Sequence, residues 1–271
     1  MARSEPLFTI VSINFNNAAG LDKTIRSVAA QDFSAKEYII VDGGSTDASP
    51  DVIGAHASHI DRILNEPDRG IYDAMNKGVA ISRGTWVLFL NSGDMFAASD
   101  VLGRLSAAAS SSDADILLGD AIVLYPDGTN RLQKAAQPEE IPYGMICSHQ
   151  SMLARRSLLV AMPFSLGRMR SDYEFILKAW RGGLRFQMLG FVIANVAAGG
   201  WSDRNRVQSL RERWTLLRET GAFSAKLLPH FGLSFFLAAL SPIAKTFLPN
   251  RAVLAIRKLK LRYLDPRSSR G

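Results

Sequence analysis

The sequence predicts an α/β protein with a Rossmann-like, mostly parallel sheet flanked by helices. In the first 98 residues, short apolar runs rich in branched and aromatic side chains alternate with segments of helical periodicity. Such runs are typical of strands that are buried on both faces of a parallel sheet. They end in polar loops that contain Asn or Asp, and in open α/β sheets ligands bind beyond the carboxyl ends of the strands. We therefore expect a binding site along this edge of the sheet.

The N-terminal region contains four predicted strands. The clearest is the apolar run at residues 86–90, which stops at the polar tetrapeptide NSGD. Gly84 is a plausible stop for the helix that precedes this strand. The alternation favours a nucleotide-binding α/β unit over an all-β protein or a helical bundle. The predicted strands cover residues 7–13, 38–41, 60–64 and 86–90, and apolar stripes mark helices at residues 21–29 and 71–79.

The second half is less regular, and we expect it to share the same sheet. A Pro-Asp-Gly turn at residues 126–128 predicts a hairpin. Ser171 or Asp172 would lie at the N-terminus of a helix. The remaining predicted elements are a helix at residues 99–105, strands at residues 116–118, 121–125 and 185–196, and an amphipathic helix at residues 207–220.

Composition limits the class of protein. The 271 residues suffice for one large domain or two small ones, and the single cysteine, Cys147, excludes an internal disulfide and favours a reducing compartment. The start of the chain has no proper signal peptide, because its apolar run is short and ends in Asn. From Arg251 onward there are seven Lys or Arg residues and one Asp, a net charge of +6 out of +7 for the whole chain.

The C-terminal region combines an apolar segment with this basic tail. Residues 232–248 are almost all apolar but include Pro242 and Lys245, and they are slightly short for a membrane span. A membrane-embedded hairpin or an in-plane helix, with the tail at lipid headgroups, fits better. The alternative is an ordinary core helix with a solvated tail. A nucleic-acid interface is disfavoured, because aromatic residues are few and no binding fold accompanies the tail.

Asn91 and Asp94 follow the strand at residues 86–90 and would lie at the rim of the site. A carboxylate at this place is a suitable hard ligand for Mg²⁺ or Mn²⁺ carrying a diphosphate. A solvated turn aspartate is the alternative, since such turns are common.

Four motifs, in order, resemble the family 2 inverting glycosyltransferases with the GT-A fold. The third motif is similar to the bacterial polysaccharide-assembly branch that includes colanic-acid enzymes. The match runs from about Leu7 to Ser202. The motifs are IVSINFNN at residues 10–17, IIVDGGSTD at 39–47, EPDRGIYDAMNKGVAISRGTWVLFLNSGD at 66–94, and SHQSMLARR at 148–156 followed by SDYEF at 171–175.

The resemblance implies a nucleoside-diphosphate sugar donor bound by residues 1–98 and an acceptor half at residues 99–222, with residues 223–271 as a membrane-associating segment. Asp42 is then the residue that contacts the base, while Phe15 and Asn16 line the nucleotide pocket. Two departures stand out. Gly43 replaces a second acidic residue of many relatives, and NSGD has fewer aspartates than the familiar form.

The resemblance also assigns the chemistry. Asp94 aligns with the surviving metal-binding aspartate, and Asn91 could ligate through its carbonyl or through water. Asp172 aligns with the catalytic aspartate, which would act as the general base. As alternatives, Asp172 only caps its helix and Glu174 serves instead. His149 is a metal ligand or phosphate contact, or a structural histidine.

Several further residues are candidates for ligand contacts. We expect Asp68 or Lys77 to touch the donor, although Asp73 and Lys77 are spaced i,i+4 and can form a plain surface ion pair. Trp201 could stack on the acceptor sugar or only pack. Arg204 and Arg206 could meet an anionic lipid diphosphate or be solvated.

The leading hypothesis is an inverting glycosyltransferase that uses Mg²⁺ or Mn²⁺. It would transfer a sugar to a lipid-linked saccharide acceptor at the cytoplasmic face of the bacterial inner membrane, for cell-surface polysaccharide. A non-catalytic sugar-nucleotide-binding scaffold is the alternative, which the missing aspartates keep open. A nucleotidyltransferase is disfavoured because no Gly-rich loop with Lys or Arg follows the first strand.

Overall fold

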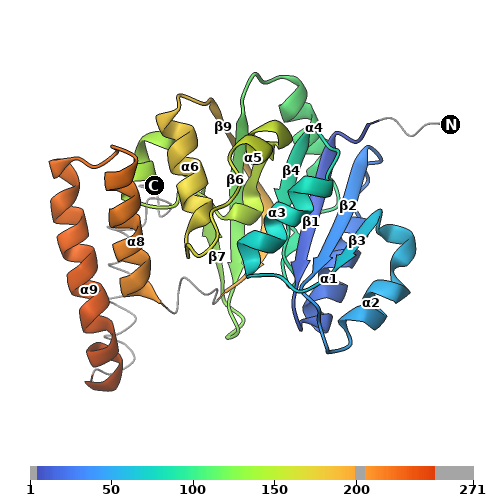
Figure 1. Ribbon diagram of the computed structural model, residues 1–271, viewed down its shortest axis with the longest axis horizontal. Helices are drawn as coiled ribbons and strands as arrows, with labels where there is room; N and C mark the ends of the chain where they lie inside the picture. Colours follow the sequence, from blue (N-terminus) through green and yellow to red (C-terminus); the bar gives the residue numbers. More distant parts are fainter. Residues whose placement is uncertain (1–4, 199–204, 248–271) are drawn as a thin grey trace.

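A computed structural model describes residues 5–198 and 205–247 (Figure 1). The predictions for Trp201, Arg204 and the basic tail lie outside these residues. The structure is the expected α/β fold, with one nine-stranded sheet in the order β3-β2-β1-β4-β8-β6-β9-β5, and β7 paired to β6. The strands are β1 Phe8–Asn14, β2 Lys36–Asp42, β3 Arg62–Asn65, β4 Trp86–Phe89, β5 Met95–Phe96, β6 Ile116–Leu124, β7 Asn130–Gln133, β8 Met152–Arg155 and β9 Phe186–Ala197.

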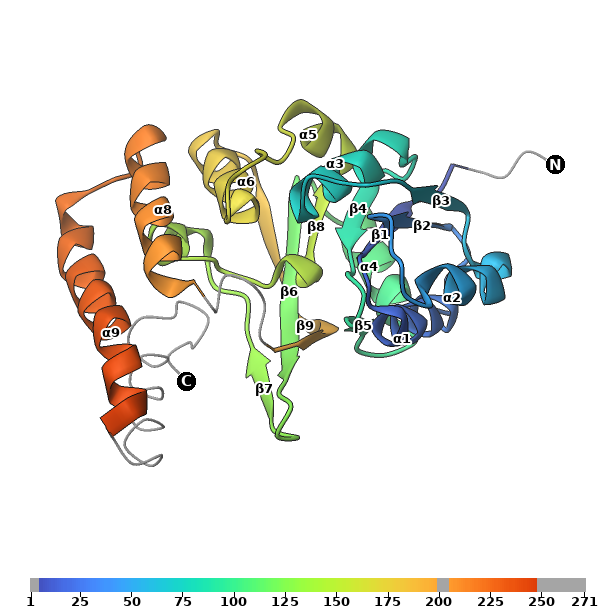
Figure 2. The same ribbon diagram turned by 60° about the horizontal axis from the view of Figure 1, so that its bottom comes forward.

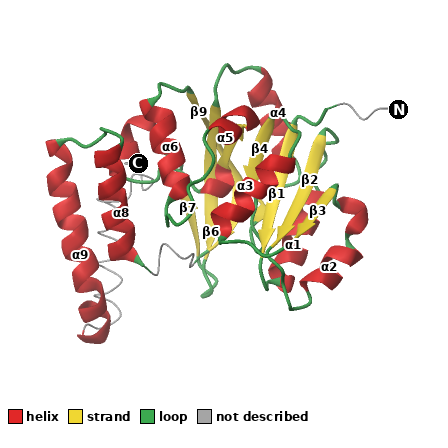
Figure 3. Cartoon of the chain, in the orientation of Figure 1, coloured by secondary structure: helices red, strands yellow, loops and turns green. Residues whose placement is uncertain are grey.

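Helices cover both faces of this sheet (Figure 3). The α-helices are α1 Ala18–Ala29, α2 Ser49–Ala55, α3 Ile71–Ile81, α4 Val101–Ser110, α5 Arg156–Ala161, α6 Ser171–Arg181, α8 Arg206–Glu219 and α9 Leu228–Phe247. The short 3-10 helices are η1 Ala57–His59, η2 Pro138–Tyr143, η3 His149–Ser151 and η4 Ala225–Leu227.

Strands β1, β2 and β4 are buried, as their apolar runs predict, whereas β3 at the edge of the sheet has no buried residue. Every residue of β1 is buried, and β1 pairs in parallel with both β2 and β4. Alternate side chains enter two cores. Val11 belongs to the core beneath α3, α5 and α6, whereas Ile10 belongs to the core beneath α1, α2 and α4. Because the strands are parallel, their carboxyl ends meet at one edge.

Gly84 does not stop the helix, which corrects the sequence prediction. Helix α3 ends at Ile81, three residues earlier. A Cβ on Gly84 would lie 2.5 Å from the backbone nitrogen of Thr9. The glycine therefore allows the chain to enter β4 close against β1.

The second half shares the sheet, as expected. Strand β6 runs without interruption where two short strands were predicted, with an irregular register next to Asp120. The predicted hairpin joins β6 to β7 through a turn with Gly128 at a φ of 80°. Strand β8, which the sequence did not reveal, lies antiparallel between β4 and β6 and links the two halves.

Helices α8 and α9 lie side by side at one end of the molecule, next to α6 (Figures 1 and 2). Leu216, Leu227 and Phe231 belong to the same core as the sheet, which therefore continues past residue 222 into α9. Residues 228–247 form one helix and not a hairpin. No helix in the described part of the chain has the length and apolar character to cross a membrane.

Candidate active site

The loops that follow β1, β2 and β4 are held together by hydrogen bonds at the carboxyl edge of the sheet. Asn16 adopts a left-handed backbone conformation with a φ of 50°. Its side-chain oxygen accepts a 2.8 Å hydrogen bond from the backbone nitrogen of Thr46, after β2. Asn17 donates a 3.0 Å hydrogen bond to the carbonyl of Ser92, after β4. Asn16 thus shapes the predicted nucleotide pocket through the loops on either side of it.

Asp42, the predicted base contact, is fully buried at the end of β2. Its carboxylate accepts hydrogen bonds of 2.6 Å from Asn14 Nδ2 and 2.7 Å from the hydroxyl of Ser45. The carboxylate therefore organises the loop around it. Asn14 Oδ1 is a buried acceptor with no hydrogen-bond partner.

An aromatic ring and a carboxylate converge over Gly43. Phe15 is 63% exposed, which is unusual for so large an apolar side chain. A Cβ on Gly43 would lie 2.5 Å from Asp68 Oδ2 and 3.3 Å from the ring of Phe15. The Asp68 carboxylate thus fills the space of a side chain at position 43. A planar nucleotide base can stack on the exposed ring of Phe15.

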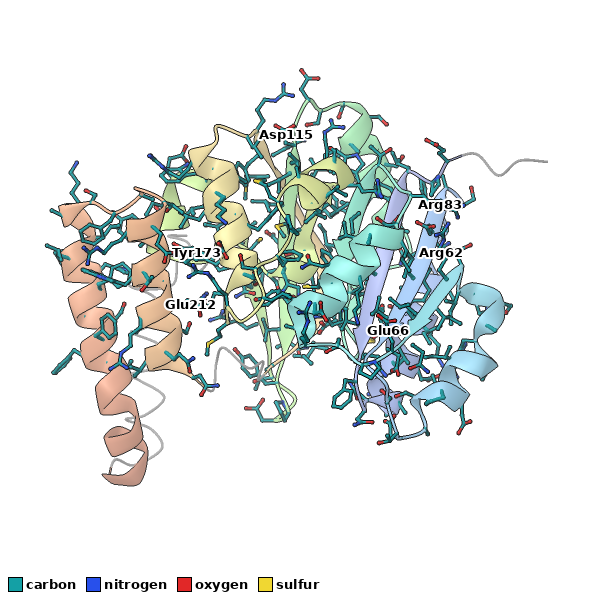
Figure 4. The ribbon with its side chains drawn as sticks, in the orientation of Figure 1. Arg62, Glu66, Arg83, Asp115, Tyr173 and Glu212 are labelled. Carbon is teal, nitrogen blue, oxygen red and sulfur yellow. The ribbon has the colours of Figure 1, made fainter. Side chains whose placement is uncertain are left out.

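Lys77 is engaged by the donor-side loop. Its ammonium lies 2.8 Å from the carboxylate of Glu66 and donates to the carbonyl of Pro67, also at 2.8 Å. Asp73 is 3.8 Å away, so the predicted i,i+4 ion pair is present. The Glu66 side chain, which is labelled in Figure 4, is half exposed.

Asn91, His149, Asp172 and Tyr72 form a continuous polar chain. Asn91 Nδ2 lies 3.0 Å from His149 Nε2, and His149 Nδ1 lies 3.6 Å from Asp172 Oδ2. The hydroxyl of Tyr72 donates a 2.9 Å hydrogen bond to Asp172 Oδ1. Both ring nitrogens of His149 therefore face polar neighbours, Nε2 the amide of Asn91 and Nδ1 the carboxylate of Asp172. These polar contacts bring together Asp172, the predicted base, His149, a predicted metal ligand, and the loop after β4.

Asp172 is not the N-cap of α6. Arg170 holds that position, and Asp172 is the second helical residue with a side chain 19% exposed. Burial raises the pKa of Asp172, but the imidazole of His149, the charge of Arg170 and the Tyr72 hydroxyl outweigh it and lower the pKa to about 2. The carboxylate is therefore ionised at neutral pH. The alternative base, Glu174, is paired with Lys178 at 2.7 Å.

Asp94 is linked to this group of polar residues through Gln150, which follows His149 in the sequence. Its Oδ2 accepts a 2.7 Å hydrogen bond from Gln150 Nε2, and its Oδ1 accepts a 3.0 Å bond from the backbone nitrogen of Ala197. The residue is 5% exposed, and burial raises the pKa of its carboxyl. Asp94 thus joins the loop after β4 to η3 and to the end of β9. It would reach a cation only by releasing one of these donors.

The residues fit a divalent cation that arrives with a diphosphate. In the described ranges, no group of three His, Cys, Asp or Glu side chains could hold a metal ion. Mg²⁺ commonly takes one or two protein ligands and completes its shell with substrate phosphates and water. Asn91 Oδ1 is a buried acceptor without a partner, and it lies beside His149. Asn91 Oδ1 is therefore free to ligate a cation, whereas His149 would first have to release Asn91 or Asp172.

Sequence reasoning missed three residues of this site: Asn14, Tyr72 and Gln150. Each lies within a quoted motif, but its importance depends on a partner far along the chain. Tyr72 is 100 residues from Asp172, and Gln150 is 56 residues from Asp94. Only a buried Asn at the end of a strand gives a signal that pattern analysis could have used.

Sequence comparison finds relatives in bacteria. The PGL/p-HBAD biosynthesis glycosyltransferase of Mycobacterium bovis (strain BCG / Pasteur 1173P2) is 32% identical over 182 residues, covering 65% of this chain and 70% of that protein. The succinoglycan biosynthesis protein ExoO of Rhizobium meliloti (strain 1021) is 30% identical over 139 residues, covering 51% of this chain and 40% of that protein.

Solved structures share the architecture. S. aureus TarS 1-349 in complex with UDP-GlcNAc has a TM-score of 0.64 at 16% identity, covering 96% of this chain and 82% of that chain. The mannosyltransferase PcManGT from Pyrobaculum calidifontis, in complex with GDP-Man and Mn²⁺, has a TM-score of 0.63 at 16% identity, covering 97% and 82%. These likenesses show the GT-A fold.

The family follows from the match along the chain itself. The family model named Glycosyl transferase family 2 matches residues 9–174, more than half of the 271 residues. This span contains the loops after β1, β2 and β4, together with His149 and Asp172. The chain belongs to glycosyl transferase family 2.

Proposed function

We propose that this glycosyltransferase inverts the anomeric centre of a sugar that it transfers from a nucleoside-diphosphate donor to a lipid-linked saccharide acceptor. The main support for the proposal is the placement of Asp172. Its ionised carboxylate is held by Tyr72 and His149 next to the loop after β4. A fixed carboxylate at the ligand-binding edge of the sheet is the arrangement that deprotonation of an acceptor hydroxyl requires.

The reaction is a single displacement. The acceptor hydroxyl oxygen forms a bond to the anomeric carbon as the bond from that carbon to the diphosphate breaks, and the nucleoside diphosphate leaves with the electron pair. The hydroxyl proton passes to Asp172 as attack makes it more acidic. The low pKa of Asp172 keeps the carboxylate ready at neutral pH, and the Tyr72 hydroxyl holds Oδ1 in place.

Mg²⁺ or Mn²⁺ is part of the proposal. A bound cation would neutralise the charge that develops on the leaving diphosphate. Asn91 Oδ1 and His149 are the residues that would hold it, in place of the pair Asp94 and His149 that the sequence suggests. Asp94 contributes by keeping Gln150, the neighbour of His149, in position.

The donor pocket is proposed at Phe15, Gly43 and Asp68. The exposed ring of Phe15 would stack on the base, while Asp68 supplies a carboxylate where the sequence has glycine. Asp42 and Asn16 would hold the loops that form the pocket. Lys77 would turn from Glu66 to the diphosphate when the donor binds.

Membrane association is proposed for the C-terminal segment, at the cytoplasmic face of a bacterial inner membrane. One face of α9 packs inward through Phe231, while Leu228, Leu233 and Phe236 are exposed at 50%, 45% and 60%. A helix that is apolar on both sides, followed by a tail of net charge +6, suits a surface of anionic lipid. This placement suits the bacterial polysaccharide-assembly branch, of which the colanic-acid enzymes are the example.

One observation supports a second candidate, a non-catalytic sugar-nucleotide-binding scaffold. Asn91 and Gly93 stand where the familiar metal motif has aspartates, so the chain offers fewer charges to a cation. The fixed Asp172 favours the enzyme.

The donor site is tested by ligand-observed NMR with UDP, GDP and dTDP, with and without Mn²⁺. We expect one nucleotide to bind and Phe15→Ala to weaken its binding by about tenfold. Leu132→Ala is the matched control, because Leu132 is 50% exposed on the β6–β7 hairpin and not on the loops after β1 and β2. Binding of no nucleotide to folded protein would contradict the donor site.

A further inference from the structure

The junction of α6, α8 and α9 contains a buried guanidinium without an ionic partner. Arg213 of α8 is 6% exposed. Its Nη1 donates a 2.7 Å hydrogen bond to the carbonyl of Tyr143, and its guanidinium carbon lies 4.4 Å from the ring centroid of Phe231 in α9. The Nε and Nη2 atoms are buried and have no hydrogen-bond partner. Three of the five N–H groups therefore lack an acceptor.

A second guanidinium lies at the same junction. Arg170, the N-cap residue of α6, donates from Nη1 to the hydroxyl of Ser209, and its Nε is also buried without a partner. The nearby carboxylate of Glu212 forms no ion pair with this guanidinium and accepts hydrogen bonds from the backbone nitrogens of Met169 and Arg170. Figure 4 shows Glu212 on α8 and Tyr173 on α6, the two helices that flank the junction.

Neither guanidinium forms an ion pair within the described residues, although the charge of Arg170 acts on the carboxylate of Asp172. Among residues 5–198 and 205–247, no carboxylate is within ion-pair distance of either guanidinium. Burial and the charge of Arg170 lower the pKa of Arg213 to about 10, so Arg213 is a cation at neutral pH. Burial and Arg213 also lower the pKa of His230 to about 4, so this neighbour is uncharged. A buried cation without an ionic partner is strongly unfavourable, so the burial of Arg213 points to an anionic ligand.

We propose that Arg170 and Arg213 form a binding site for a phosphate or diphosphate group carried by the acceptor. Guanidinium N–H groups match phosphate oxygens in a planar, two-pronged geometry. Assigning the phosphate to the acceptor rests on the proposed function. Arg170 precedes Asp172 by two residues, so the site adjoins the proposed base, whereas Phe15 and Gly43 lie at the ends of β1 and β2. On its other side is α9, the helix proposed to meet the membrane.

The site is tested on the full chain with inorganic phosphate and pyrophosphate, followed by calorimetry and thermal unfolding. The variants are Arg213→Lys and Arg170→Gln, so that the test survives if one fails to fold. Arg211→Gln is the matched control, because Arg211 is exposed on the same helix. Flotation with vesicles of phosphatidylcholine, with and without phosphatidic acid, shows whether a lipid phosphate can reach the site.

We expect pyrophosphate to bind and stabilise the wild type and the control, with binding at least about tenfold weaker in both site variants. Enhanced flotation with phosphatidic acid that depends on Arg213 supports a lipid source, while pyrophosphate binding alone supports a soluble acceptor phosphate. Equal binding by wild type and variants, or none by folded wild type, overturns the site.

The outcome is separable from the proposed function. Nucleotide binding measured on the same variants should be unchanged, because the donor pocket lies at the other loops. If no nucleotide binds while pyrophosphate binds through Arg213, the anion site stands and the transferase assignment fails. If nucleotide affinity falls in step with pyrophosphate affinity, the phosphate belongs to the donor and the acceptor assignment is overturned.

Discussion

The hydroxyl of Tyr72 donates a 2.9 Å hydrogen bond to Asp172 Oδ1 across 100 residues of sequence. Tyr72 lies in the first turn of α3, directly after the donor-side loop that contains Asp68, whereas Asp172 opens α6. Burial and the charge of Asp172 raise the pKa of Tyr72 well above its usual value, so the hydroxyl remains a donor at every working pH. The bond therefore ties the position of the proposed base to the helix that follows the donor loop.

Replacing this hydroxyl tests the positioning role. We expect Tyr72→Phe to lower kcat by about tenfold, because one oxygen of the base loses its anchor, and to leave nucleotide affinity unchanged. Steady-state kinetics and nucleotide titration measure the two quantities separately. Tyr143→Phe is the control, since it keeps the ring that packs against His230. Equal losses of kcat and nucleotide affinity would show that Tyr72 only supports the fold.

Asp172 makes stability depend on pH. Its pKa is lowered from 3.8 to about 2, so the ionised form stabilises the fold above the unfolded pKa, and this contribution is lost as pH falls through about 2. We expect Asp172→Asn to cost about 2 kcal/mol at pH 7. In urea unfolding, the difference in unfolding free energy between wild type and Asp172→Asn should shrink as the pH falls toward about 2. A difference that is the same at every pH would contradict the hydrogen-bonding of the charged form.

Asn91 and Asp94 have different proposed roles, Asn91 as a metal ligand and Asp94 as a structural acceptor. We expect Asn91→Ala and His149→Ala to weaken Mn²⁺ binding in the presence of nucleotide by about tenfold, because they remove the proposed ligands. Asp94→Ala should instead lower stability by about 2 kcal/mol, since Gln150 and the Ala197 amide lose their acceptor. Manganese titration and urea unfolding distinguish the two effects. Loss of Mn²⁺ affinity confined to Asp94→Ala would make Asp94 the ligand.

Gly43 keeps the donor pocket open. A Cβ at this position would lie 2.5 Å from Asp68 Oδ2, so Gly43→Ala must displace that carboxylate or the loop that carries it. We expect nucleotide affinity to fall by about tenfold. Gly54→Ala is the control, because a Cβ there meets nothing within 4 Å. Unchanged affinity in Gly43→Ala would place the base elsewhere.

Helix α9 provides the test of membrane association. We expect the double substitution of Leu233→Ser and Phe236→Ser to weaken binding to anionic vesicles by about tenfold or more, because two exposed apolar side chains are removed. Vesicle sedimentation measures this, with Leu132→Ser on the β6–β7 hairpin as the control. Equal binding of all three proteins would exclude this face of α9 from the interface.

Much of the N-terminal half could be predicted, because strands buried on both faces produce continuous apolar runs. The prediction failed where contacts with distant segments decide whether a short segment forms a strand. Strand β8 is only four residues long and depends on β4 and β6 for its hydrogen bonds. Gly119 interrupts the apolar pattern of β6, yet the strand continues because its neighbour Ile193 fills the space beside the glycine.

The same limit applies to the site. Local motifs place Asn91, Asp94, His149 and Asp172 after their strands or at a helix start, and the resemblance assigns their roles. Which of them touch is set by pairs far apart in sequence. Arg213 illustrates this: the sequence shows an arginine-rich amphipathic helix, but it does not reveal that this particular arginine faces inward.

Asp172 is the proposed base of the sugar transfer. The most direct measurement is the release of nucleoside diphosphate from UDP-, GDP- and dTDP-sugars by wild type and by Asp172→Asn, with nucleotide binding measured on both. We predict release by the wild type with one donor class, a rate at least about 100-fold lower in Asp172→Asn, and equal nucleotide affinity. Equal release rates in the two proteins would show that Asp172 is not the base.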